Sequence, residues 1–156
     1  MATVNLRPRG GQFGGVEPCG NVTVLRYELE TNSSGVPKNT DHASALVVDD
    51  VVRQQYPMPA GFMIHDLQVI VSDHFGASVT ADVGFAYADG VNDATHPQSA
   101  THFGTGLALS ATGRIRTASA AALFALPKDA YLTITIKGAN IAQAGKLQVA
   151  VIGERL

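Results

Sequence analysis

The stretch that decides the fold runs from Phe62 to Ala88 and reads FMIHDLQVIVSDHFGASVTADVGFAYA. In its second half every odd position is apolar, while the even positions carry small or polar side chains. The apolar set is Val79, Ala81, Val83, Phe85 and Tyr87. A period of two residues is typical of a β-strand with one buried face.

The first half of this stretch predicts a second strand. Its apolar face includes His65 together with Met63, Leu67, Val69 and Val71. On this pattern His65 points inward and is a core histidine held by hydrogen bonds. We interpret the two halves as an antiparallel hairpin that turns at residues 73–77 and whose apolar side needs a second layer.

Working outward, alternating patterns predict further strands on both sides of this hairpin. Before it, Leu25, Tyr27 and Leu29 follow Val22 and Val24 in the opposite phase, which suggests a β-bulge. The other expected strands lie within residues 45–53, 101–111, 113–116, 130–137 and 147–151. Residues 119–126 fit either an edge strand or a helical turn. Eight or nine strands without a helix predict an all-β fold, a jelly-roll-like antiparallel β-sandwich.

The bulk composition fits one domain and excludes several classes of protein. A chain of 156 residues can bury a sizeable core without disulfides, and the single Cys19 cannot pair within the chain. A net charge of -2 with no basic block argues against a nucleic-acid partner. No apolar run is long enough to span a bilayer, and residues 1–9 lack the apolar core of a signal peptide. Charged residues make up 15%, against about 25% in typical chains, which suggests a surface partly covered by another protein.

The N-terminal segment differs in composition from the rest of the chain. Residues 7–20 contain five glycines and two prolines, so they cannot form a core of their own. We therefore divide the chain into an extended N-terminal arm over residues 1–20 and a β-sandwich domain over residues 21–156. The arm is either a disordered tail or a segment that becomes ordered on a neighbouring subunit, with Arg7, Arg9 and Phe13 as its contacts.

The sequence contains no recognisable catalytic motif, and we predict neither an enzyme nor a bound cofactor or metal. No serine lies in a G-x-S-x-G turn, and Gly104–Gly106 is not followed by a helix that could bind phosphate. The oxygens of Asp89, Asn92 and Asp93 could hold a calcium ion but equally suit an ordinary turn. The five histidines show no zinc spacing, although His96 and His102 could approach each other.

Four segments, residues 78–90, 111–116, 126–138 and 144–151, carry a resemblance to a known group of proteins. Their glycine-turn order and strand pattern resemble small virion proteins of tailed bacteriophages, in particular the cement, or decoration, proteins of the phage head. The resemblance spans about residues 60–153. It implies a jelly-roll-like subunit that forms homodimers or homotrimers and bridges neighbouring major capsid proteins.

We therefore expect a structural virion protein, made in the host cytoplasm and bound non-covalently to the outside of the capsid. An arm or a sheet edge can add main-chain hydrogen bonds to a neighbour, and a lattice of such contacts raises avidity without any chemistry. The alternative is a carbohydrate- or host-surface-binding module of a phage tail that uses the polar loop at residues 89–100. A hydrolase that uses scattered acids or histidines is a third hypothesis.

Overall fold

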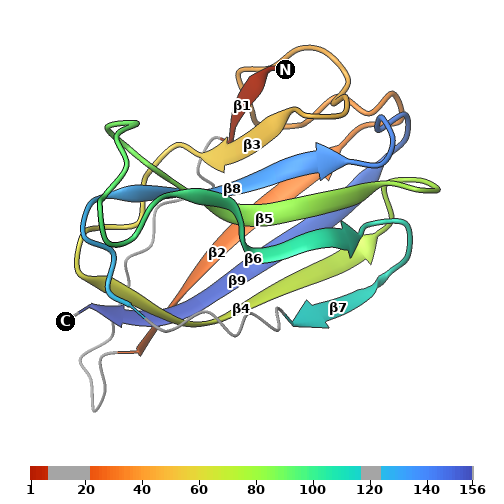
Figure 1. The fold of residues 1–156 in the computed structure, drawn as a ribbon. Helices are drawn as coiled ribbons and strands as arrows, with labels where there is room; N and C mark the ends of the chain where they lie inside the picture. The colour runs from red at the N-terminus through yellow and green to blue at the C-terminus, as the bar shows by residue number, and fades with distance from the viewer. Residues whose placement is uncertain (7–21, 117–123, 156) are drawn as a thin grey trace.

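The computed structural model describes residues 1–6, 22–116 and 124–155, and these ranges contain nine strands and no helix (Figure 1). The strands are β1 (Thr3–Leu6), β2 (Val22–Thr31), β3 (Val51–Gln54), β4 (Phe62–Asp73), β5 (Thr80–Tyr87), β6 (Ser99–Ala108), β7 (Gly113–Arg116), β8 (Ala130–Lys137) and β9 (Gly145–Arg155). The prediction of an all-β fold is confirmed.

The strands form two sheets that pack face to face. Sheet A has the strand order β1-β3-β8-β5-β6, and sheet B has the order β2-β9-β4-β7. The pair β1 and β3 is parallel, and the other neighbouring strands are antiparallel. Strands β2 to β9 change sheet at every connection except the one between β5 and β6, as Figure 1 shows. Eight strands divided in this way between two four-stranded layers form a jelly roll, which confirms the predicted architecture.

The core lies between the sheets and is built from their alternating inward positions. All five odd-numbered apolar residues from Val79 to Tyr87 are at most 2% exposed, as their period predicts. Leu147, Val149 and Val151 of β9 meet them from sheet B and are at most 1% exposed. The inner faces of both sheets therefore contribute to one continuous apolar core.

The predicted hairpin of residues 62–88 is wrong in its pairing. Strand β4 lies in sheet B beside β9 and β7, whereas β5 lies in sheet A beside β8 and β6. The connection between them crosses from one sheet to the other, and its Phe75 is fully buried. Gly76 and Ser78 adopt positive φ values of 116° and 63°, which turn the chain across the end of the sandwich. Both strands bury one face in the same core, so a shared pattern does not make them neighbours.

The bulge predicted in β2 does not exist, and a different bulge occurs in β4. All ten residues of β2 pair with β9 in an unbroken register, so Val22 and Val24 point outward and are 62% and 48% exposed. In β4 the register with β9 shifts between Ile64 and Asp66. The extra residue is His65, which is exposed and lies 3.0 Å from Glu154 through its Nε2 atom. The prediction of a core histidine is therefore wrong.

The N-terminal boundary of the sandwich also differs from the prediction. Residues 3–6, which we assigned to the arm, form β1 and bury Val4 and Leu6 to 0% and 4% exposure. These two side chains have the same alternation as the other strands, but the stretch is too short to have been recognised. The strand expected within residues 45–53 begins only at Val51, because Asp50 closes a turn by donating its N–H to the Val47 carbonyl, 3.1 Å away.

Candidate functional site

The predicted contact residues Arg7, Arg9 and Phe13 lie outside the described residues, as does Cys19. The structure does describe how the segment that leads to them is held. The Ala2 N–H donates to Asp50 Oδ1 at 2.7 Å, and the Val47 N–H donates to Asp50 Oδ2 at 2.9 Å. Asp50 itself is 1% exposed. This buried carboxylate fixes the start of β1 to the edge of sheet A.

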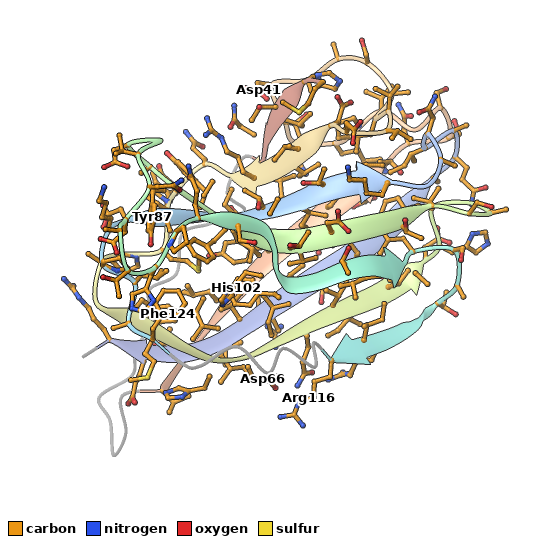
Figure 2. The ribbon with its side chains drawn as sticks, in the orientation of Figure 1. Asp41, Asp66, Tyr87, His102, Arg116 and Phe124 are labelled. Atoms are coloured by element: carbon orange, nitrogen blue, oxygen red, sulfur yellow. The ribbon has the colours of Figure 1, made fainter. Side chains whose placement is uncertain are left out.

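A second set of polar contacts fixes the middle of β1. Asn5 donates its N–H and its side-chain amide to the carboxylate of Asp41, at 3.0 and 2.8 Å. Arg53 donates its Nε–H to Asn5 Oδ1 at 2.7 Å, and its guanidinium lies 4.6 Å from the centre of the Tyr131 ring. Figure 2 shows Asp41 beside β1, at the margin of sheet A. Leu6, the last residue of β1, is therefore held at a fixed position on the margin of sheet A.

In the polar loop that joins β5 to β6, the side-chain oxygens that could have bound a metal ion accept hydrogen bonds from the backbone of the loop itself. Asp89 Oδ1 accepts the Val91 N–H, and Asp93 Oδ1 accepts those of Thr95 and His96, each at 2.9 Å. Asn92 Oδ1 accepts the Gln98 N–H at 3.1 Å. The bonds to Asp89 and Asp93 are typical of Asx turns, and they hold the pKa values of both aspartates below the usual range. The described residues contain no group of three His, Cys, Asp or Glu side chains that could hold a metal ion.

Aromatic side chains close the end of the sandwich beneath this loop. His96 stacks on Phe124 with ring centroids 4.2 Å apart, and His102 meets the same ring edge-on at 5.5 Å. The predicted approach of the two histidines is therefore found, with Phe124 as the ring they share. Figure 2 shows Tyr87, His102 and Phe124 at this end. His102 also contacts Phe85, which is 1% exposed, so the cluster continues into the core.

Burial and neighbouring charge shift the protonation of this cluster. Desolvation lowers the pKa of His102, and the charge of His96 lowers it further. Desolvation raises the pKa of Tyr87, with smaller contributions from the charges of Asp93 and Asp89. Its hydroxyl donates a hydrogen bond to the His96 carbonyl. A neutral His102 and a hydrogen-bonded phenol suit a packed end cap.

The centre of the outer face of sheet A carries small, covered side chains. Thr133 and Thr135 point outward from the central strand β8 but are only 5% and 7% exposed. Gly84 of β5 lies directly beneath β6, and a Cβ atom at this position would be 2.0 Å from the Ser99 carbonyl oxygen. Lys137 pairs with the carboxylate of Asp49. The centre of this face, around β8, therefore has few exposed groups with which to bind a partner.

The outer face of sheet B is more open and carries apolar side chains and charges together. Val22 and Val24 project from β2, and Val24 lies beside the half-buried Ile152 of β9. Arg26 on β2 and Arg114 on β7 are exposed at the two margins of the sheet. We name this surface, which comprises Val22, Val24, Arg26, Ile70, Arg114, Ala150 and Ile152, the sheet B patch.

An ion pair flanks the sheet B patch at β7. The guanidinium of Arg116 forms two contacts with the Asp66 carboxylate, at 3.1 Å from Nε and 3.0 Å from Nη2. Burial raises the pKa of Asp66, but the Arg116 guanidinium and the Gln68 amide outweigh it, and the pKa lies below its usual range. Figure 2 shows Asp66 and Arg116 pointing together from β4 and β7. Arg116 is therefore already neutralised, unlike its neighbour Arg114.

Comparison with known proteins identifies the fold. The chain matches no protein-family model and no curated protein. It is similar to a chain in the capsid of Ralstonia phage GP4, with a TM-score of 0.60 and 15% identity over 97% of this chain and 98% of that one. It is also similar to a chain in the capsid asymmetric unit of cyanophage Pam1, with a TM-score of 0.54 and 14% identity over 95% of each chain. At these identities the similarity shows a shared fold.

Sequence reasoning missed the sheet B patch, although a signal for it was present. Val22 and Val24 alternate with Leu25, Tyr27 and Leu29 in the opposite phase, which we interpreted as a bulge that keeps every apolar residue inside. The simpler interpretation was a regular strand with apolar residues on both faces. Contiguous apolar side chains on the solvent face of a sheet mark an interaction surface. The described residues include no helix long and apolar enough to cross a membrane.

Proposed function

We propose that this chain is a structural virion protein, a cement or decoration subunit that binds the outside of a phage head. On this proposal it contacts the major capsid protein and a second copy of itself, as a homodimer or homotrimer, and stabilises the shell without covalent bonds. The observation that carries the proposal is the jelly-roll fold shared with chains of two phage capsids over nearly the full length of both partners.

The architecture of the described residues is consistent with this function. Both sheets are long, the core is continuous, and the polar groups that could have formed a site are used in turns and ion pairs. A rigid block with this internal bonding is suited to hold position in a lattice, where many moderate contacts add up. The internal use of Asn92 and Asp93 also disfavours the loop at residues 89–100 as a glycan-binding site.

Within this proposal the N-terminal arm attaches the subunit to the shell through Arg7, Arg9 and Phe13. Asp50 and Asp41 anchor β1 up to its last residue, Leu6, so the arm would reach its neighbour from a defined origin. Arginine and aromatic side chains are enriched at the centres of protein interfaces.

Particle binding tests the proposal directly. Purified protein is added to heads of the encoding phage that lack it, and bound copies are counted by gel densitometry and located by electron cryomicroscopy. We expect ordered density on the outer surface, at a position repeated by the capsid symmetry. Density inside the shell, or no bound protein, would contradict the proposed function.

The arm is tested with the triple substitution of Arg7, Arg9 and Phe13 by alanine, which keeps the length of the connection between β1 and β2. Deleting residues 1–15 would be unsuitable because it removes the buried Val4 and Leu6 of β1. We expect the triple variant to fold normally and to lose occupancy on heads. Tyr56→Ala removes an aromatic side chain that is 60% exposed elsewhere and serves as the control. Equal occupancy of the two variants would eliminate the arm as the attachment device.

A further inference from the structure

The lysines and arginines in the described part of the chain differ in whether a carboxylate pairs with them. Lys128, Lys137, Lys146 and Arg116 each pair with a carboxylate within the subunit. By contrast, Arg26 has no ion pair with any described residue, and Arg114 donates only to the amide oxygen of Gln68, at 2.6 Å. Two exposed guanidinium groups therefore lack a carboxylate in the described part of the chain.

These two arginines lie on opposite margins of the sheet B patch. Arg26 is on β2 and Arg114 is on β7, so three strand spacings, about 14 Å, separate their strands. The strands between them present Ala150 and Gln148 from β9 and Gln68 and Ile70 from β4, all of them half buried. The patch therefore has an uncharged centre with a positive charge on either side, and charges at the rim of an interface select the partner and its orientation.

The size of the patch suits a specific interface. Three strands of 10 to 12 residues and the four-residue β7, at roughly 3.4 Å per residue and about 4.8 Å between strands, give on the order of 600 Å² for the face, near the ~800 Å² that one partner contributes to a typical complex. Within it Val22 and Val24 are 62% and 48% exposed. Covering these two side chains would remove apolar surface from water, which is the main source of affinity in such contacts.

We propose that the sheet B patch docks an acidic protein surface, whose carboxylates pair with Arg26 and Arg114 while an apolar strip covers Val22, Val24 and Ile152. This inference rests on the proposed function and makes it more specific, because the acidic surface would belong to the major capsid protein. The same subunit would then be held at two places, by its arm and by the outer face of sheet B.

Two other occupants fit the charges less well. A second copy of the same face brings carboxylates that already have partners, since Asp66 pairs with Arg116, Glu154 with His65, and Glu28 with Lys146. A nucleic acid requires a dense array of cations, whereas this face also carries those carboxylates and the whole chain has a net charge of -2.

Charge removal tests the proposal on the full-length protein. The double variant Arg26→Gln and Arg114→Gln is compared with the double variant Lys128→Gln and Lys137→Gln, which changes net charge equally but lies off the sheet B patch. We expect the arginine variant to bind heads about 10-fold more weakly and with less dependence on salt, because two rim ion pairs are lost. The lysine variant should bind like the wild type.

The arginine-to-lysine variant of both positions retains the charges and should recover most of the binding. Equal binding by the two glutamine variants would overturn the inference and leave the proposed function standing. A wild-type protein that ignores heads altogether would overturn both. Conversion of the free oligomer to monomers by the arginine substitutions, seen by light scattering, would show that the occupant is a second copy. DNA binding by the wild type that the arginine substitutions abolish would show that the occupant is a nucleic acid. Either of these two results would overturn the proposal.

Discussion

The two outer faces of the sandwich differ in how completely their side chains are covered. On sheet A the outward Thr133 and Thr135 are nearly covered, and Arg53 is held between Asn5 and the Tyr131 ring. On sheet B, Val22 and Val24 are exposed, and Arg26 has no described counter-ion. Both faces come from strands with the same alternating pattern.

The difference follows from what lies beside each central strand. In sheet A, β8 lies between β5, which contributes Gly84, and β3, which contributes the long side chain of Arg53. Strand β6 passes directly over Gly84. In the described part of the chain no strand passes over β9 of sheet B, and its neighbour β2 forms the margin of the sheet. A face closed by its own chain supports stability, whereas an open face with unmatched charge is available for binding.

The largest effect is expected where sheet A is closed most tightly. In Gly84→Ala the added methyl group would meet the Ser99 carbonyl oxygen at 2.0 Å and the Ala100 backbone at 2.4 Å, so β6 must move away from β5. We expect a loss of ~3 kcal/mol in the free energy of unfolding, measured by urea denaturation. The matched control is Gly113→Ala, because nothing lies within 4 Å of a Cβ atom there. Equal stability of the two variants would show that sheet A is as open as sheet B.

The next effect concerns the attachment of β1 to sheet A. Asp50→Ala removes the acceptor of the Ala2 and Val47 N–H groups within a buried site. We expect a loss of ~2 kcal/mol in unfolding free energy and faster hydrogen exchange at the Val4 amide. Asp49→Ala breaks an exposed contact with Lys137 and should change stability little. Unchanged exchange at Val4 in Asp50→Ala would mean that β1 is held by β3 alone.

The sequence predicted which residues are buried better than it predicted which strands are neighbours. The alternation in residues 78–87 identifies the buried face correctly, because burial depends on local pattern. The pairing of β4 with β9, and of β5 with β8, depends on contacts between segments tens of residues apart. No pattern within residues 62–88 contains that information, so a crossover between sheets was interpreted as a hairpin.

Prediction of the candidate site failed because the sequence pattern placed a bulge in the wrong strand. The sequence suggested a bulge in β2, where the register is regular, and none in β4, where His65 is the extra residue. Bulges depend on the fit between neighbouring strands, which a single strand does not reveal. For the arm residues Arg7, Arg9 and Phe13 the sequence remains the source of the hypothesis.

A smaller effect is expected from pH at the end of the sandwich, where the two sheets meet under Phe124. The pKa of His102 in the folded protein lies below its ordinary value of 6.5, so the unfolded chain binds that proton more readily than the folded one. Stability should therefore fall as the pH drops through and below about 6.5. We expect the difference in Tm between pH 7.5 and pH 5.0 to shrink in His102→Gln but not in His74→Gln. An unchanged difference in His102→Gln would assign the acid sensitivity to other groups.

The smallest effect is expected at His65, and it tests whether the outer face of sheet B begins where the β4 bulge places it. His65→Ala removes an exposed contact with Glu154, so the unfolding free energy should change by less than ~0.5 kcal/mol. Leu67→Ala, two residues along the same strand, empties a core position that is 1% exposed and should cost about 2–5 kcal/mol. A large loss in His65→Ala would place this side chain in the core, and residues Asp66, Gln68 and Ile70 would then need a different register. A small loss instead keeps all three on the open face, where they border the pair of unmatched arginines.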